Sequence, residues 1–471
     1  MAPPGGEEVN MINFKDQIAA AFRKGVAGEL EPRDNQVDAV VAVLMKLSSR
    51  GGNCLVQAAP GVGKSLTIAL TAQQAIQVLK FDAVLLLTDR TTLDEQLGET
   101  CKRFLENHGV NCIRINESDV SDSTYLLKAL LKEAETWKPF VALTTVQTLW
   151  QLKNTTSLSV NLQRIGIICD EAHRSHAKKS ATDGSWDSVS FESIAQTFGS
   201  QAYSAMGVQP SHVHYVGFTA TPSDEALSLF GECDLRKNTI EWTPTYTFSL
   251  KDAVDQGLVL DVLDHYRTST EKETAERTTV ILRDFHTARQ EVTGWPVKGM
   301  IVVGSRNAVA EYVRALRTSD ESLCVYGFFS DRVDGKSEGE FNGFDERDAA
   351  QATKAACEKG DILVVCDKLE TGYDDPRLSR MYVCRKYSSP GKFVQVVNRI
   401  NRINSDCPGK IAKVLDFENG KEEVSDWVEQ YKGKSSCSIP YEARDLKRVK
   451  ELESKRLGMS DVEFQEYNAL S

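Results

Sequence analysis

A glycine-rich loop is the part of this chain best suited to chemistry. Residues 58–65 read AAPGVGKS, between the apolar run 53–57 and a helix-like stretch that begins at Leu66. A strand, such a loop and a helix in this order form a phosphate cradle, because glycines let backbone N–H groups close on phosphate oxygens and the helix N-terminus favours negative charge. We therefore expect Lys64 to reach the β- and γ-phosphates of ATP and Ser65 to hold Mg²⁺. The expected nucleotide-binding residues of the loop are Pro60, Gly61, Val62, Gly63, Lys64 and Ser65.

Two acidic residues complete the expected ATP site. Asp170 and Glu171 follow the apolar run 165–169, which is typical of a buried parallel strand. Ligands bind at the carboxyl ends of strands in open α/β sheets. We expect Asp170 to hold Mg²⁺ through water, and Glu171 to orient and deprotonate the water that attacks ATP. Each motif alone has a structural alternative, a glycine-rich turn or an acidic strand end, but the two in this order favour the ATP site.

A third group of residues is expected to complete catalysis. Residues 395–402 read QVVNRINR, and the spacing of Gln395, Arg399 and Arg402 places them on one face of a predicted helix. Arginines from a second lobe stabilise charge on a transferring phosphoryl group. The alternative is an ordinary basic helix, and the two preceding motifs favour the catalytic interpretation.

Composition indicates an intracellular globular protein. The chain has 471 residues, of which 41% are hydrophobic and 26% charged, and this length suits two or three domains. Its 11 cysteines show neither Cys-x-x-Cys pairs nor zinc-ligand spacing, so we interpret them as reduced thiols. No apolar run approaches the roughly 20 residues that span a membrane. The acidic start has no apolar core, so we expect no signal peptide and no membrane contact.

Charge leaves the question of a nucleic-acid partner open. The net charge of −11 argues against a generally basic coat, but local fields decide binding. Residues 377–413 hold nine basic residues and one acidic residue, Asp406. This segment is either a solvated basic face or a surface for phosphates.

Hydrophobic patterning predicts an α/β fold with two tandem doubly wound parallel sheets. The expected strands of the first sheet are 53–57, 83–88, 140–144, 165–169 and 213–218, with helices at 33–50, 64–80, 92–107 and 123–136. A linker is expected near 222–245, followed by strands at 299–303, 322–327, 361–366, 379–384 and 411–416. The expected domains are an N-terminal extension (1–30), an ATP-binding domain (31–235), a second domain (236–435) and a helical tail (436–471).

The order of the motifs resembles superfamily 2 helicases and translocases, with two RecA-like domains. The loop, the Asp-Glu-Ala-His box at 170–173, Thr-Ala-Thr at 219–221 and Gln-x-x-x-Arg-x-x-Arg at 395–402 carry this resemblance. Ala58 stands where the general P-loop has glycine, as is familiar in helicase-type loops. A closer resemblance, over roughly residues 30–418, is to the motor subunit of type I restriction enzymes. It rests on DEAHRS at 170–175, TDR at 88–90, GFTATP at 217–222, YTFSL at 246–250 and TGYD at 371–374.

This resemblance implies further roles. Gln36, preceded by Arg33, would read the adenine edge, and Gln395 would position water or sense the γ-phosphate. Thr219 and Thr221 would couple nucleotide state to nucleic acid. The residues implied to face the nucleic-acid backbone are Thr88, Arg90, Thr145, Ser305 and Thr371.

The sequence departs from the family in two ways. Only about 30 residues precede Arg33, and no Asp…Glu-x-Lys cluster is evident, so we expect no nuclease activity. Residues 174–212 form a long insertion, interpreted as a surface loop or as a contact for a partner or nucleic acid.

We therefore expect an ATP- and Mg²⁺-dependent motor, most simply a translocase on double-stranded DNA, which can work with protein partners in a DNA-processing complex. The alternatives are an RNA or single-stranded DNA helicase, and an ATP-binding regulatory subunit. A P-loop kinase or metabolic ATPase is disfavoured by the second lobe.

Overall fold

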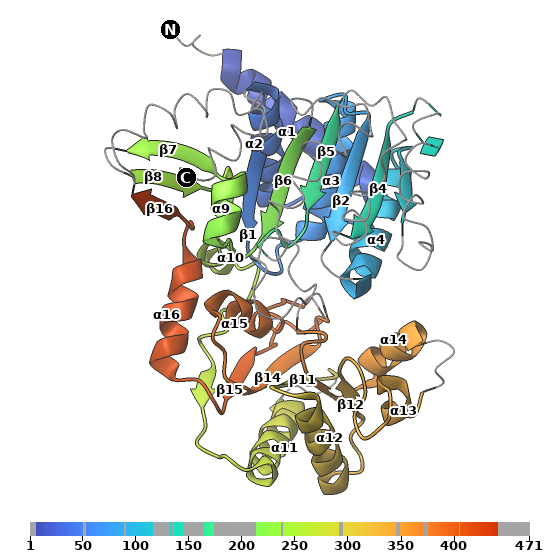
Figure 1. Cartoon of the computed structure of the whole chain (residues 1–471), viewed down its shortest axis with the longest axis vertical. Helices are drawn as coiled ribbons and strands as arrows, with labels where there is room; N and C mark the ends of the chain where they lie inside the picture. The colour runs from blue at the N-terminus through green and yellow to red at the C-terminus, as the bar shows by residue number, and fades with distance from the viewer. Residues whose placement is uncertain are drawn as a thin grey trace. The chain divides into compact units, whose positions relative to one another are not determined.

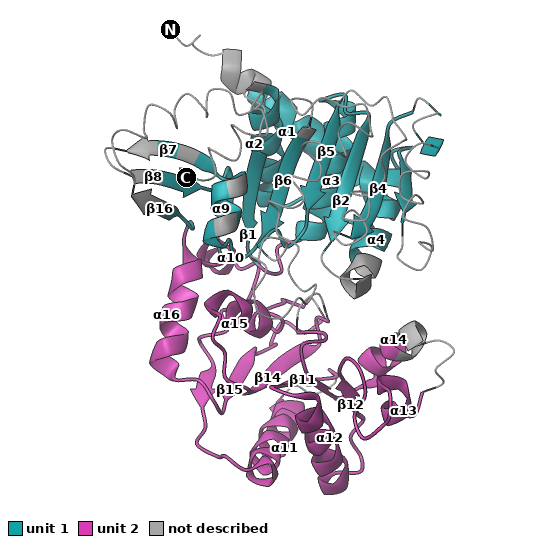
Figure 2. Cartoon of the chain, in the orientation of Figure 1, with its two compact units in different colours: residues 1–59, 63–249, 434–471 teal, residues 60–62, 250–433 magenta. Residues whose placement is uncertain are grey.

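The computed structural model describes most of the chain (Figure 1). The described residues are 6–49, 53–88, 91–115, 132–133, 136, 138–145, 164–173, 213–236, 239–291, 295–344, 349–370, 373, 375–404 and 406–440. They form two compact units (Figure 2), the first comprising Met1–Ala59, Gly63–Ser249 and Lys434–Ser471, the second Pro60–Val62 and Leu250–Gly433. The functional domain bounds expected from the sequence stay a prediction.

The first unit is built on a seven-stranded sheet in the order β3-β4-β2-β5-β6-β1-β9, and every neighbouring pair is parallel. Figure 1 shows β4, β2, β5, β6 and β1 side by side. The strands are β1 (Asn53–Ala58), β2 (Ala83–Thr88), β3 (Asn111–Arg114), β4 (Phe140–Thr145), β5 (Ile165–Cys169), β6 (Val213–Thr219) and β9 (Tyr246–Phe248). Central strands β2, β4 and β5 are buried along their whole length, which explains their continuous apolar sequences.

Helices cover this sheet. They are α1 (Gly6–Gly25), α2 (Asp34–Ser49), α3 (Lys64–Gln77), α4 (Thr91–Glu106) and α9 (Asp224–Phe230). Helix α1 packs on α4 through an edge-on contact between the rings of Phe22 and Phe104, whose centroids lie 6.2 Å apart. Both rings are buried, so this contact belongs to the core of the first unit.

One expectation for this region was wrong. The predicted linker near 222–245 instead contains α9 and two strands, β7 (Glu232–Arg236) and β8 (Thr239–Thr243). These strands form an antiparallel three-stranded sheet with β16 (Cys437–Pro440), in the order β16-β8-β7. Trp242 is fully buried there, so the segment is a packed element of the first unit.

The second unit repeats the architecture with a six-stranded sheet in the order β10-β15-β14-β11-β13-β12, again with parallel neighbours. Its strands are β10 (Tyr266–Thr268), β11 (Lys298–Val303), β12 (Val325–Phe328), β13 (Ile362–Val365), β14 (Leu378–Cys384) and β15 (Lys413–Asp416). Its helices are α10 (Leu250–Asp255), α11 (Thr274–Glu291), α12 (Arg306–Ser319), α13 (Glu338–Asn342), α14 (Ala349–Lys359), α15 (Pro390–Val397) and α16 (Lys421–Lys432).

The expected fold class, two tandem doubly wound parallel sheets, is therefore confirmed. The expected insertion at 174–212, the tail beyond 440 and most of the helix expected at 123–136 lie outside the described residues. In the part of the chain that the structure describes, no helix has both the length and the apolar character that crossing a membrane requires.

Candidate ATP site and motor elements

Three of the predicted motifs lie at one edge of the first sheet. The glycine-rich loop follows β1, Asp170 follows β5, and Thr219 ends β6, which lies between those two strands. Since all neighbouring pairs are parallel, the carboxyl ends of the three strands meet at the same edge. This is the edge where ligands bind in open α/β sheets.

The backbone of the loop needs its glycines. Gly61 and Gly63 have φ angles of 92° and 91°, in the left-handed region that other residues rarely adopt. A Cβ atom on Gly63 would also lie 2.5 Å from Nε2 of Gln36. Gly63 is the N-cap of α3, which begins at Lys64, so the loop presents a helix N-terminus as predicted for a phosphate cradle.

Lys64 is the centre of the site's charge. Its Nζ lies 2.5 Å from Oε1 of Glu171 and 3.1 Å from Oδ1 of Asp170. The three side chains are only about 15–16% exposed. Burial alone would lower the pKa of Lys64, but the two carboxylates outweigh it and raise that pKa, so the ammonium stays charged. Burial, together with the neighbouring Glu171, raises the pKa of Asp170 despite the attraction of Lys64.

Glu171 adopts an unusual backbone conformation. Its φ angle is 49°, and a non-glycine residue held in this region costs on the order of 1–3 kcal/mol, a type of strain that clusters at functional sites. Its backbone N–H donates to Oδ1 of Asp170 at 2.9 Å. The turn therefore fixes the two carboxyl groups relative to each other.

His173 connects this turn to the next strand, and the sequence interpretation assigned it no role. Its Nδ1 lies 2.8 Å from Oγ1 of Thr219 and 3.4 Å from Oε2 of Glu171. The backbone N–H of Thr221 also donates to Oγ1 of Thr219 at 3.1 Å. The Asp-Glu-Ala-His box and the Thr-Ala-Thr segment thus form one hydrogen-bonded network. The histidine of the box was the feature of the sequence from which this connection could have been predicted.

Gln36 contacts the loop directly. Its Nε2 donates to the carbonyl of Gly63 at 3.1 Å, and its Oε1 accepts from the backbone N–H of Arg33 at 3.0 Å. The side chain is buried, whereas Arg33 is exposed. The structure thus places Gln36, and through it Arg33, next to the glycine-rich loop. Their recognition of adenine stays a prediction.

Two candidate nucleic-acid contacts of the first unit are neighbours. Thr88 ends β2 and Thr145 ends β4, and the register pairs them directly. Both are buried, at 2% and 3% exposure. Arg90 lies outside the described residues.

The residues of the second unit that the sequence predicts to complete catalysis are arranged differently from the expectation. Helix α15 ends at Val397 and Asn398 is its C-cap, so Gln395, Arg399 and Arg402 do not share one helical face. Gln395 is buried in the helix. Arg399, beyond it, donates to the carbonyls of Glu370 and Tyr373, each at 3.3 Å.

Arg402 and Ser305 have local partners. Arg402 donates to Oδ1 of Asn401 at 2.8 Å and forms an isolated bridge with Val259. Ser305 caps α12 by accepting from the N–H of Ala308 at 3.2 Å. Thr371 lies outside the described residues.

A buried ion cluster holds the turn after β13. Glu370 is completely buried and accepts from Arg385 Nη1 at 2.9 Å, while Lys392 Nζ lies 3.2 Å from its other oxygen. Both cations also pair with Asp367, at 3.1 and 2.7 Å. Burial would raise the pKa of Asp367, but Lys392 and Arg385 outweigh it and hold that pKa below its usual value. The cluster fixes the turn whose Glu370 carbonyl Arg399 contacts.

We expect Glu370→Ala to lower the free energy of unfolding of the second unit by about 3–5 kcal/mol, because removing one partner of a buried ion pair leaves the other charges uncompensated. Denaturant unfolding of the full chain measures this. Lys386→Ala breaks only the exposed pair with Glu423 and should cost less than about 1 kcal/mol. Equal losses in the two variants would contradict the assigned role of the cluster.

The basic segment 377–413 is mostly committed to internal contacts. Six of its cations pair with carboxylates, namely Arg377 with Asp375, Arg380 with Asp284 and Glu291, Arg385 with Asp367 and Glu370, Lys386 with Glu423, Lys392 with Asp367 and Glu370, and Lys413 with Asp284. Lys410 donates to two backbone carbonyls. These contacts favour a structural role for the segment over a broad phosphate-binding surface.

The fold defines a class, the tandem RecA-like α/β proteins, and in this chain a glycine-rich loop follows strand β1 of the first sheet. Comparison with known proteins agrees. Residues 29–224 match the family described as "Type III restriction enzyme, res subunit", and residues 298–419 match "Type I restriction enzyme subunit R domain 3". The expected resemblance to type I restriction enzyme subunits is therefore confirmed.

Individual relatives support the same conclusion. The EcoKI type I restriction endonuclease subunit of Escherichia coli K12 is 27% identical over 240 residues, which are 50% of this chain but only 18% of that subunit. A fragment of a putative HsdR subunit from Vibrio vulnificus is 17% identical, with a TM-score of 0.53 over 87% of this chain and 67% of the fragment. Dbp5 of Saccharomyces cerevisiae, bound to RNA and ADP BeF3, is 13% identical, with a TM-score of 0.58 over 94% of this chain and 99% of Dbp5. At these identities the two structures show the fold alone.

Proposed function

We propose that this chain is a nucleic-acid-dependent ATPase that moves along double-stranded DNA. The observation that carries the proposal is the contact of Lys64 with both Asp170 and Glu171, at the sheet edge where α3 begins. A buried lysine between two carboxylates beside a helix N-terminus can exchange those partners for phosphate oxygens when a nucleotide binds.

The residues of the first unit then have separate tasks. Lys64 binds the β- and γ-phosphates, and Glu171 orients the attacking water and takes its proton. The Asp170 carboxylate and the Ser65 hydroxyl are oxygen ligands of the kind that Mg²⁺ prefers, so this donor set fits the metal. Mg²⁺, when bound, would neutralise charge on the phosphates. Gln36 and Arg33 would recognise adenine.

The second unit would supply Gln395, Arg399 and Arg402 to the same nucleotide, with the arginines stabilising charge on the transferring phosphoryl group. Thr219 and Thr221 would couple nucleotide state to grip on the strand. The proposed backbone contacts are Thr88, Arg90, Thr145, Ser305 and Thr371.

Double-stranded DNA is proposed because the family matches are to restriction enzyme subunits. Dbp5, whose structure contains RNA, shares the fold, so an RNA or single-stranded DNA helicase is the principal alternative. The restriction-enzyme relatives also suggest protein partners. We expect DNA to remain uncut, because no Asp…Glu-x-Lys cluster is evident in the sequence.

The test is the rate of ATP hydrolysis without nucleic acid and with blunt duplex DNA, single-stranded DNA or structured RNA. Strong stimulation by blunt duplex supports the proposal, and a duplex length series then tests movement. Stimulation by single strands or RNA alone would replace translocation with strand unwinding. Basal turnover that none of the nucleic acids changes would favour an ATP-binding regulatory subunit and overturn the motor.

We expect Lys64→Ala to weaken ATP binding by about tenfold or more and to abolish turnover, since it removes a charge-assisted contact to the phosphates. Titration with a fluorescent ATP analogue measures the affinity. Lys46→Ala, at a cation of the first unit paired with Glu232, is the matched control and should bind normally. Unchanged affinity in Lys64→Ala would rule out the proposed phosphate contact.

A further inference from the structure

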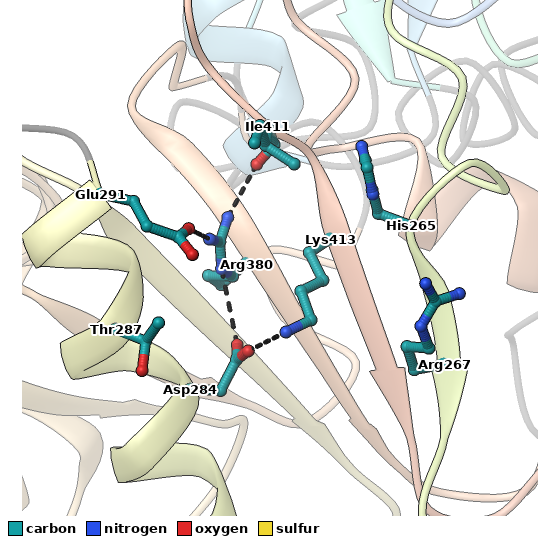
Figure 3. Close-up of a pocket in the computed structure, with 8 residues that line it drawn as sticks. All are labelled: His265, Arg267, Asp284, Thr287, Glu291, Arg380, Ile411 and Lys413. Atoms are coloured by element: carbon teal, nitrogen blue, oxygen red, sulfur yellow. Dashed lines mark hydrogen bonds and ion pairs between the residues drawn. The ribbon is translucent and has the colours of Figure 1, made fainter.

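A second cavity lies within the second unit and is used by none of the proposed motor residues (Figure 3). Its volume is about 210 Å³, enough for several water-sized groups. Four nitrogen-bearing side chains and two carboxylates line it, namely His265, Arg267, Arg380, Lys413, Asp284 and Glu291. A hollow with this many convergent polar groups is a candidate binding site.

The cavity is at the amino ends of the strands. Lys413 begins β15, Arg380 is near the start of β14, and Arg267 is in the short strand β10. Ser305 and Asp367, by contrast, follow the carboxyl ends of β11 and β13. In parallel sheets these are opposite edges, so the cavity is separate from the motor elements of this unit.

On one side of the cavity, carboxylates of α11 neutralise the neighbouring cations. Asp284 pairs with Lys413, accepts from the Tyr382 hydroxyl at 3.0 Å and has Arg380 Nε 3.5 Å from its Oδ2. In Figure 3 the side chains of Lys413 and Arg380 point toward this carboxylate. Glu291 lies 3.4 Å from Nη2 of Arg380.

The other side holds positive charge without an acidic partner. Among the described residues no carboxylate pairs with His265 or Arg267, and the Arg267 guanidinium donates to the backbone carbonyl of Tyr266 at 3.2 Å. Arg380, by contrast, is held by Asp284 and Glu291, so the charge without an acidic partner is on the side of His265 and Arg267. The three formal positive charges exceed the two negative ones, so the cavity favours an anion.

We propose that this cavity binds a phosphate group. Its donors come from three strands, so they approach a ligand from different directions. A tetrahedral phosphate accepts from several directions at once, whereas a carboxylate offers two oxygens in one plane. Arginine matches phosphate through its fork of N–H groups, and lysine binds it as a point charge. The group belongs either to a small phosphate-bearing molecule or to a nucleic-acid backbone.

Equilibrium dialysis of the full chain against radiolabelled inorganic phosphate tests the proposal. The Lys64→Ala variant is the background, because it removes the phosphate contact of the ATP site. This variant should retain one saturable site. Adding Arg267→Ala or His265→Ala should weaken that site, by about tenfold or more for the arginine, since a charged hydrogen bond is lost. Both residues are exposed, so neither change removes core packing.

Arg283→Ala is the matched control, because Arg283 is an exposed arginine of α11 outside the cavity lining, and it should leave binding unchanged. Competition by a duplex oligonucleotide would identify the nucleic-acid backbone as the source of the phosphate, and lack of competition would identify a small molecule. Loss of all phosphate binding in Lys64→Ala would overturn the proposal. Binding that is indifferent to Arg267→Ala and His265→Ala would overturn it as well.

Discussion

Glu171→Gln should bind ATP with nearly normal affinity and hydrolyse it on the order of a thousandfold more slowly, because loss of a positioned general base typically costs between about 10² and 10⁴ in rate. Glutamine has nearly the size of glutamate and keeps a side-chain oxygen, so its neutral amide can still accept a hydrogen bond from Lys64. What is lost is the carboxylate that can accept a proton from water. Single-turnover hydrolysis and nucleotide titration, run side by side, separate chemistry from binding.

The geometry makes this variant informative. Glu171 reaches Lys64 at 2.5 Å from a turn with positive φ, and an amide side chain leaves that backbone unchanged. Glu29→Gln is the matched control in the same unit, since Glu29 is an exposed residue paired with Arg103, and its turnover should be normal. If Glu171→Gln hydrolysed ATP at a rate within a few fold of wild type, a group other than Glu171 would have to accept the proton of the attacking water.

The sheets were predictable because their central strands are buried on both faces. Strand β2 runs from Ala83 to Thr88 and β5 from Ile165 to Cys169, the same bounds that their apolar runs predict. Strands buried on both faces need no alternation of polar and apolar residues, so a continuous apolar run is enough to identify them in the sequence. The loop and the acidic pair then follow their strands, and the parallel topology brings them to one edge.

The antiparallel sheet was not predictable in the same way. Strands β7 and β8 are short and charged, and the second partner of β8, strand β16, begins at Cys437, far along the chain. Strand preference depends on packing against neighbours, and this distant neighbour of β8 is invisible in a local window. The buried Trp242 was the one local sign that this segment packs into a core.

The end of α15 shows a different limit. The spacing of residues 395–402 fits a helix, but Asn398 Nδ2 donates to the carbonyl of Val394 at 2.8 Å. Asparagine side chains compete with the backbone for such carbonyls and end helices. The same spacing therefore does not place Arg399 and Arg402 on one face. The Glu370 cluster was also missed, because its cations lie well away from it in sequence.

Arg402→Ala is expected to keep ATP binding and lose most nucleic-acid-stimulated turnover, by about a thousandfold, which is the lower range for removal of an arginine finger. The change should leave the fold intact. Its side chain donates to the neighbouring Asn401 at 2.8 Å, and its bridge with Val259 is made by the backbone. Stimulated ATPase rate, nucleotide affinity and denaturant unfolding measure the three properties separately.

A second substitution distinguishes charge from geometry at this position. Arg402→Lys keeps the positive charge but loses the planar fork that grips two phosphate oxygens, so it should recover only a small part of the lost rate. Arg314→Ala, at an exposed arginine paired with Asp334, is the control and should turn over normally. Normal stimulated turnover in Arg402→Ala would exclude this arginine from the reaction. Full recovery in Arg402→Lys would show that charge, and no bidentate contact, is what the second unit contributes.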